Sequence, residues 1–206
     1  MIFYDEYARV PEQTLRDFVS SQELGRLVTA GEGQPHIGLY PFVPIDDRIE
    51  IHLHRADEQL ADLRANPRCA FEVDEVHATI PSHWVHATNA MFATAYHRAV
   101  IFECEALVSE DAEVLAAQQQ RLMARYQPEG QHAPVSTSQA MYRGAFGHIA
   151  ALTLRIKARR VKWKLGQNRD RKARENIIAE LRRRGRATDA RAADALQWTL
   201  DLEASK

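Results

Sequence analysis

The sequence has few of the features that would place the protein outside the cell or in a membrane. Its 206 residues include two cysteines, Cys69 and Cys104, which excludes a disulfide framework and favours buried free thiols in a reducing compartment. No stretch approaches the roughly 18 uninterrupted apolar residues of a membrane-spanning helix. Residues 1–6 lack the basic start and apolar run of a secretory signal. We therefore expect a cytoplasmic protein that has no membrane partner.

Several common catalytic motifs are also absent. The chain has no Gly-x-Gly-x-x-Gly sequence, no Walker loop, no Gly-x-Ser-x-Gly elbow and no His-Glu-x-x-His pair. These absences argue against a Rossmann dinucleotide site, phosphoryl transfer, a serine hydrolase and a zinc peptidase. No residue stands out as a general acid or base, so the catalytic residues stay unassigned.

Charge is distributed unevenly along the chain. The formal net charge is only −1, but residues 155–191 contain 15 Lys and Arg against four Asp and Glu. Residues 1–154 contain 11 basic and 21 acidic residues. This pattern predicts an acidic body with a basic C-terminal extension, which could contact a phosphate, a nucleic acid or the body of a second subunit. Solvated helix faces would explain the same charge run.

The hydrophobic pattern predicts a mainly β fold with peripheral helices. Apolar and polar residues alternate as in half-buried strands in six segments: 26–29, 36–44, 48–54, 69–74, 95–108 and 149–165. Helical spacing occurs at 11–22, 57–65 and 109–126, and in two further segments after Gly166. Residues 75–93 read as a long loop or an interrupted strand, and residues 127–147 read mainly as loop with room for one helical turn. Short strands without strand–helix–strand alternation predict a small antiparallel barrel. We expect one domain over residues 1–165 and a basic helical extension over residues 166–206.

Histidine is abundant in this sequence, with nine residues. Most of the nine histidines lie between His36 and His97, and His52 and His54 point to the same face of a predicted strand. Three interpretations remain open: a metal site, hydrogen-bonded histidines at a barrel rim, and histidines that contact a bound ligand. No Cys-x-x-Cys pair accompanies them, so we assign no metal.

A predicted strand runs directly into a helix after His54 and Arg55. The first N–H groups of a helix can bind an anion, and Arg55 supplies a charged donor beside them. This arrangement would suit a phosphate. An ordinary strand-to-helix turn with a solvated arginine is the alternative.

Six short motifs occur in order along the chain: residues 25–29 (GRLVT), 36–42 (HIGLYPF), 52–56 (HLHRA), 64–67 (RANP), 80–84 (IPSHW) and 163–169 (WKLGQNR). Together they resemble the FMN-binding split-barrel proteins related to pyridoxamine 5′-phosphate oxidase, and in particular their PaiB-like branch. Two departures from the family pattern stand out. Relatives often carry Lys or Arg at the position of Gln59, and residues 92–98 differ from the PaiB-like pattern.

The resemblance implies a homodimer of six-stranded antiparallel split barrels, with FMN at the subunit interface and a helical C-terminal extension. It implies an oxidoreductase that acts on a small molecule with reduced nicotinamide as electron source. A PaiB-like, flavin-binding regulator of transcription and a haem-binding split barrel are the alternatives. The implied cofactor-binding residues come from three parts of the chain: Tyr40, Phe42, His52, His54, Arg55 and Gln59 from the barrel, Trp84 from the irregular loop, and Lys164, Gln167 and Asn168 from the C-terminal element.

Overall fold

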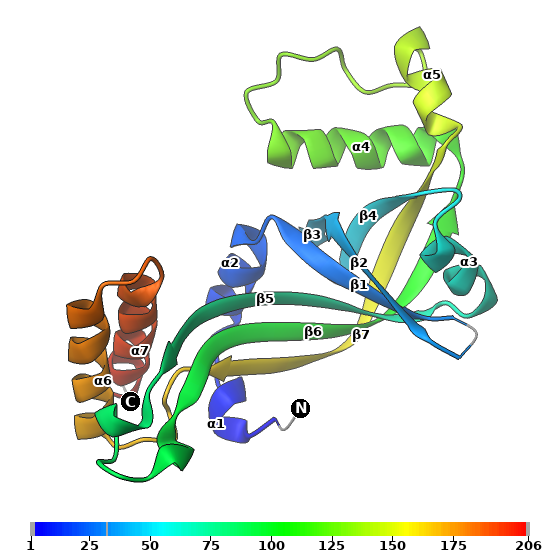
Figure 1. The fold of residues 1–206 in the computed structure, drawn as a ribbon. Helices are drawn as coiled ribbons and strands as arrows, with labels where there is room; N and C mark the ends of the chain where they lie inside the picture. The colour runs from blue at the N-terminus through cyan, green and yellow to red at the C-terminus, as the bar shows by residue number, and fades with distance from the viewer. Residues whose placement is uncertain (1–2, 32, 205–206) are drawn as a thin grey trace. The chain divides into compact units, whose positions relative to one another are not determined.

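The computed structural model describes residues 3–31 and 33–204, and within these ranges the strands form one seven-stranded sheet (Figure 1). The strand order is β2-β1-β5-β6-β7-β4-β3. The strands are β1 (Leu24–Ala30), β2 (Pro35–Pro41), β3 (Val43–Ile45), β4 (Arg48–His54), β5 (Arg68–Ile80), β6 (Thr94–Ser109) and β7 (Ile149–Lys164). The helices are α1 (Asp5–Ala8), α2 (Glu12–Ser21), α3 (Glu58–Ala65), α4 (Ala112–Tyr126), α5 (Ala140–Phe146), α6 (Arg171–Arg184) and α7 (Asp189–Ala204), with the short 3₁₀ helices η1 (Ser82–Trp84) and η2 (Ala90–Phe92).

The chain divides into two compact units. The first unit contains residues 1–14, 74–100 and 160–206, and the second contains residues 15–73 and 101–159. The long strands β5, β6 and β7 each contribute residues to both units. We describe each unit by itself.

The second unit contains the paired part of the sheet. β1 pairs antiparallel with β2, with Val28 opposite Ile37, and with β5, with Leu27 opposite Phe71. β4 pairs antiparallel with β7 along its whole length, from Arg48 to His54. Along β4, Ile49, Ile51 and Leu53 are buried, as the alternation in the sequence predicts. The β1–β2 hairpin is confirmed by its register, although Glu32 in its turn lies outside the described residues.

Three helices of the second unit begin or pack through identifiable side chains. Asp57 accepts a hydrogen bond from the main-chain N–H of Gln59 and so caps α3. Asp111 caps α4 in the same way, by accepting hydrogen bonds from the main-chain N–H groups of Glu113 and Val114. The sequence predicted Ser109 as this cap, so the observed cap lies two residues later. α5 packs on α4 in a cluster of buried residues that comprises Leu115, Ala116, Phe146 and Ala151.

In the first unit, α6 and α7 lie side by side (Figure 1). Leu181 and Leu196 are fully buried, and the rings of Trp163 and Trp198 meet with centroids 5.4 Å apart. α6 ends at Gly185, which adopts the left-handed conformation that favours glycine (φ 66°). The two predicted tail helices are therefore confirmed, and so is the residue that separates them.

The predicted class of fold is confirmed, with two differences in its elements. The expected strand over residues 36–44 is divided into β2 and β3, which gives seven strands rather than six. At the break, the main-chain N–H of Phe42 donates to the hydroxyl of Tyr126 instead of to a neighbouring strand. Of the two interpretations of residues 75–93, the interrupted strand fits residues 75–80, which continue β5, and the chain leaves the sheet at Pro81. The proposed boundary after residue 165 stays a prediction.

Candidate functional site

Arg55 lies where β4 leads into α3, and its guanidinium group is held from three sides. Nε donates to the carbonyl of Ile149 (3.1 Å), and Nη2 donates to the carbonyl of Phe146 (3.3 Å). Nη1 lies 3.0 Å from a carboxylate oxygen of Glu110, which also pairs with Arg64. These three charged side chains leave a net charge of +1 at this corner. Arg55 therefore tethers the start of β7 and still contributes positive potential.

The two histidines of β4 differ in their surroundings. His54 is exposed, accepts a hydrogen bond from the N–H of Ala56 and stacks on His148 with ring centroids 6.1 Å apart. His52 is half-buried, and burial lowers the pKa of its imidazole. Its Nδ1 is buried without a hydrogen-bond partner among the described residues. A buried polar atom without a partner is uncommon, so His52 offers a position for a ligand contact.

Gln59 and Tyr40 form a hydrogen-bonded hub. The Tyr40 hydroxyl lies 2.8 Å from Oε1 of Gln59 and 3.1 Å from a carboxylate oxygen of Asp57. Burial and the charge of Asp57 raise the pKa of Tyr40. The amide nitrogen of Gln59 donates to the carbonyls of Leu27 and His36. Gln59 is 2% exposed, so it joins β1, β2 and α3 where relatives often carry a cation.

Gly38 makes room for this hub. A Cβ atom at residue 38 would lie 2.2 Å from the Tyr40 hydroxyl and 2.3 Å from Oε1 of Gln59.

Phe42 is fully buried and packs edge-on against Phe71, with ring centroids 5.2 Å apart. Phe42 is therefore part of the core of the second unit.

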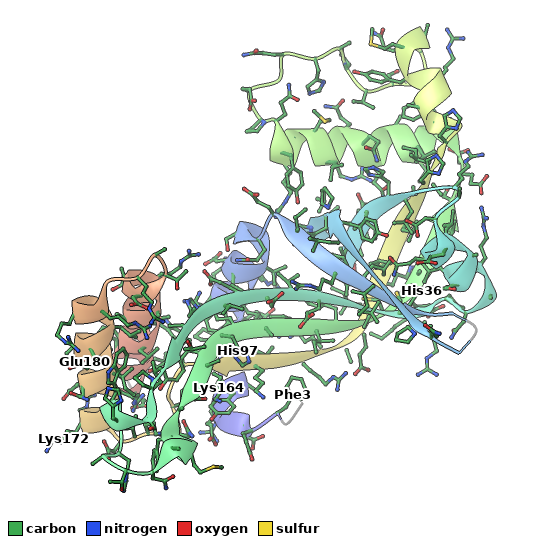
Figure 2. The ribbon with its side chains drawn as sticks, viewed as in Figure 1. Phe3, His36, His97, Lys164, Lys172 and Glu180 are labelled. Atoms are coloured by element: carbon green, nitrogen blue, oxygen red, sulfur yellow. The ribbon has the colours of Figure 1, made fainter. Side chains whose placement is uncertain are left out.

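The remaining expected residues lie in the first unit, where Lys164 belongs to a group of basic side chains. Figure 2 shows Lys164 on β7 and His97 on β6. Nζ of Lys164 donates to the hydroxyl of Thr94 at 2.5 Å. Burial and the charges of Lys162 and Arg169 lower the pKa of Lys164. Burial and the charges of Lys162 and Lys164 likewise lower the pKa of His97.

Gln167 and Asn168 follow directly after β7. Oε1 of Gln167 accepts a hydrogen bond from the main-chain N–H of Leu165 (2.8 Å), and its amide donates to the carbonyl of Trp163 (2.7 Å). Gln167 therefore stabilises the turn at the end of the strand, while Asn168 is exposed. Nearby, the hydroxyl of Tyr96 is buried without a hydrogen-bond partner among the described residues.

Trp84 lies in η1 and is 7% exposed. Its carbonyl accepts a hydrogen bond from the amide of Asn176 on α6 at 2.6 Å, and the guanidinium of Arg184 lies 4.8 Å from its ring centroid. The sequence drew attention to Trp84 but not to Asn176 or Arg184, because these partners lie about a hundred positions away. Tyr96 and His97 follow directly after the irregular loop, and from the sequence either could contact a substrate, which stays a prediction. Lys162 was not singled out, although its period-two placement relative to Lys164 on a strand was a usable signal.

The ten expected residues are thus divided between the two units. Tyr40 and Gln59 are in direct contact within the second unit, and His54 and Arg55 adjoin at one strand end. Lys164, Gln167 and Asn168 lie at the end of β7 in the first unit. Within the described ranges, no group of three or more His, Cys, Asp or Glu side chains is arranged to hold a metal ion.

Residues 1–158 match the protein family described as "Putative FMN-binding domain". The chain belongs to this family. Among curated proteins, none matches the sequence. None of the helices in the described parts of the chain is long and apolar enough to cross a membrane.

Solved structures with the same fold come from several bacteria. A conserved hypothetical protein from Mycobacterium tuberculosis is 21% identical, with a TM-score of 0.59, and the alignment covers 80% of this chain and 91% of that one. The flavocytochrome Anf3 from Azotobacter vinelandii is 16% identical, with a TM-score of 0.64 and coverages of 79% and 72%. An FAD and heme binding protein from Mycobacterium smegmatis is 18% identical, with a TM-score of 0.57 and coverages of 82% and 78%. At these identities the likeness establishes a shared split-barrel fold.

Proposed function

We propose that this protein is an FMN-binding oxidoreductase that acts on a small molecule, takes electrons from a reduced nicotinamide and works as a homodimer. The observation that carries the proposal is the match of residues 1–158, about three quarters of the chain, to the FMN-binding domain family. The motifs that resemble the PaiB-like branch support the same assignment.

Each unit, taken by itself, presents donor groups that suit an anionic ligand. In the second unit, Arg55 and His54 would hold the phosphate, and the unpartnered Nδ1 of His52 could receive or donate a hydrogen bond. In the first unit, Lys164 and the hydroxyl of Tyr96 offer a cation and an unpartnered donor. Anionic and planar ligands need such donors in a half-buried setting. Phe42 and Gln59 would support these residues from the interior rather than contact the flavin.

When bound, FMN supplies hydride transfer, and the protein supplies binding and electrostatics. Burial and then the charges of Lys162 and Arg169 lower the pKa of Lys164, and an anionic ligand would offset the part that comes from these charges. His97 has a lowered pKa, so it is mainly neutral near pH 7 and can accept a proton at a ring nitrogen. We assign His97 as the side chain best suited to exchange a proton with a substrate.

The test is an FMN titration of the purified protein, followed by the quenching of flavin fluorescence. We expect saturable binding that Lys164→Gln weakens by about tenfold, because one charge-assisted contact contributes about 1.5 kcal/mol. Lys157→Gln is the matched control, because Lys157 lies on the same strand but pairs with Glu105 at 2.9 Å. Failure of the wild-type protein to bind FMN would overturn the proposal. Equal weakening by both variants would remove Lys164 from the site.

Two alternative functions have different signatures. A haem-binding split barrel would show a single intense Soret band after addition of haemin. A regulator that binds DNA through its basic extension would show salt-dependent binding to duplex DNA. Four of the basic residues in that extension form ion pairs in the first unit: Arg182 with Asp194, Arg183 with Glu180, Arg184 with Asp189 and Arg191 with Glu75. These pairs reduce the positive charge that the extension can offer to DNA.

A further inference from the structure

The first unit contains a cavity of about 520 Å³ that the flavin proposal does not use. One wall is formed by the end of β5 and by η1, and it presents Ile80, Pro81 and Trp84. The other wall is formed by the C-terminal end of α6 and the residues after it, and it presents Arg183, Arg184 and Arg186. The volume lies within the range of small-molecule sites, about 300–1,000 Å³.

Arg184 fixes the two walls to each other. Its Nη1 donates to the carbonyl of Thr79 at 2.9 Å, and its guanidinium lies over the ring of Trp84. Two further hydrogen bonds, of 2.7 and 2.5 Å, join it to Asp189, which is 1% exposed. These bonds raise the pKa of Arg184 and lower that of Asp189. Arg184 is therefore held in place at the cavity wall, and Asp189 largely neutralises its charge.

Two exposed arginines line the cavity, and they differ in their pairing. The side chain of Arg183 is 72% exposed and its charge is paired with that of Glu180. Arg186 is exposed, and only its main-chain N–H donates to Asp189, so its guanidinium group supplies most of the positive charge there. None of the residues found to line the cavity is acidic, counting only the described part of the chain. His83, at the same opening, adds a further donor. A cationic rim above an apolar and aromatic wall selects for a ligand with one anionic group and one flat apolar face.

We propose that this cavity binds a small planar aromatic molecule that carries a single carboxylate or phosphate group. Arg186 and Arg183 hold the anionic group, and Ile80, Pro81 and Trp84 contact the ring. This inference goes beyond the flavin proposal and does not depend on it. It assigns Trp84 to a second ligand rather than to FMN.

The test uses 2-naphthoate as the probe and isothermal titration calorimetry as the measurement, with 2-naphthamide as the uncharged counterpart. We expect saturable 1:1 binding of 2-naphthoate and at least about fivefold weaker binding of 2-naphthamide, because the amide lacks the charge-assisted contact. Arg186→Gln should weaken 2-naphthoate binding by about fivefold or more. Arg182→Gln should change it by less than about twofold, because Arg182 precedes the cavity-lining residues and pairs with Asp194.

Three outcomes would overturn the inference. Equal affinities for the acid and the amide would remove the anion site, and absence of saturable binding would remove the ligand class. Duplex DNA binding that Arg182→Gln and Arg186→Gln weaken equally would show a nucleic-acid surface instead. Preloading the protein with FMN separates the two proposals. Unchanged 2-naphthoate binding supports an independent site, whereas competition would assign the cavity to the flavin.

Discussion

Arg121 on α4 holds the buried carboxylate of Glu50 on β4 through two hydrogen bonds, from Nε at 2.7 Å and from Nη2 at 3.0 Å. Glu50 is 3% exposed, and Arg48 adds a third bond at 3.2 Å. A buried carboxylate is tolerated only when it is paired and hydrogen-bonded. This ion pair therefore fixes α4 to the sheet of the second unit.

We expect Arg121→Met to lower the free energy of unfolding by about 2–4 kcal/mol, because it leaves Glu50 with a single cationic partner in the interior. Urea unfolding at pH 7 measures the loss. Lys157→Met is the control, since the Lys157–Glu105 pair is exposed and should contribute less than about 1 kcal/mol. The double variant Arg121→Met/Glu50→Gln should recover part of the loss. Equal effects of the two single variants would contradict this interpretation.

His77 makes the stability of the protein sensitive to mild acid. It is 1% exposed, its Nδ1 has no hydrogen-bond partner among the described residues, and its Nε2 lies 3.4 Å from a carboxylate oxygen of Glu75. Burial lowers its pKa to about 4, although the charge of Glu75 opposes this shift. Between the unfolded value of 6.5 and about 4, the unfolded chain takes up the proton more readily than the folded one. The contribution of neutral His77 to the free energy of unfolding is therefore fully present above pH 6.5. It is lost as the pH drops through this window, by up to about 3 kcal/mol.

Urea midpoints measured from pH 7 to pH 4 test this prediction. His77→Gln should flatten the pH dependence, because the residue no longer titrates. His86→Gln, a substitution of an exposed histidine, should leave the dependence as it is in the wild-type protein. A wild-type profile that stays flat down to pH 4 would show that His77 is not buried in its neutral form.

Gly38→Ala should destabilise the second unit by about 1–3 kcal/mol, because the new methyl group meets the Tyr40 hydroxyl and the Gln59 amide oxygen, and the hub must shift. Gly144→Ala is the matched control, since no atom lies within 4 Å of a Cβ at that position in α5. That substitution should be neutral or stabilising by up to about 1 kcal/mol. Thermal unfolding would distinguish the two variants. A Gly38→Ala protein as stable as the wild type would show that the Tyr40–Gln59 contact does not require glycine at residue 38.

Arg55→Ala should weaken FMN binding by at least about 1.5 kcal/mol, roughly tenfold, if Arg55 pairs with the phosphate. The substitution also removes the bonds to Phe146 and Ile149, so the titration should be made under conditions where circular dichroism shows a folded variant. Riboflavin, which lacks the phosphate, provides the control: its affinity should be the same in both proteins. An unchanged dissociation constant for FMN would assign Arg55 a purely structural role.

Local patterns in the sequence predicted much of the fold. The alternation in β4, the helical spacing of α2 and the glycine that ends α6 are properties of neighbouring residues, so they can be read without tertiary information. The seventh strand was not predictable in this way. It arises because the hydroxyl of Tyr126 binds the main chain of Phe42, 84 positions earlier. The sequence left the continuation of β5 open between a loop and an interrupted strand, because Pro81 and the residues after it show no regular period.

The candidate site was less predictable than the fold. The position of His54 and Arg55 could be predicted because a strand end and a helix start adjoin in sequence, and their role in binding stays a prediction. The role of Gln59 could not, because its partners Leu27 and His36 lie on two other strands. The cavity beside Trp84 depends on Arg184, whose position follows from the packing of α6. Contacts between side chains that are so far apart in sequence do not produce a periodic pattern that could be recognised in the sequence.

The path of the chain limits how this protein can be dissected. The polypeptide passes from one compact unit to the other after residues 14, 73, 100 and 159, and the last three of these passages lie inside β5, β6 and β7. Neither unit is a contiguous stretch of sequence, so neither can be excised by a simple truncation. Isolating the first unit would require new loops to join its three segments. For the same reason, recombination with a relative could exchange the two units only by crossing over within strands.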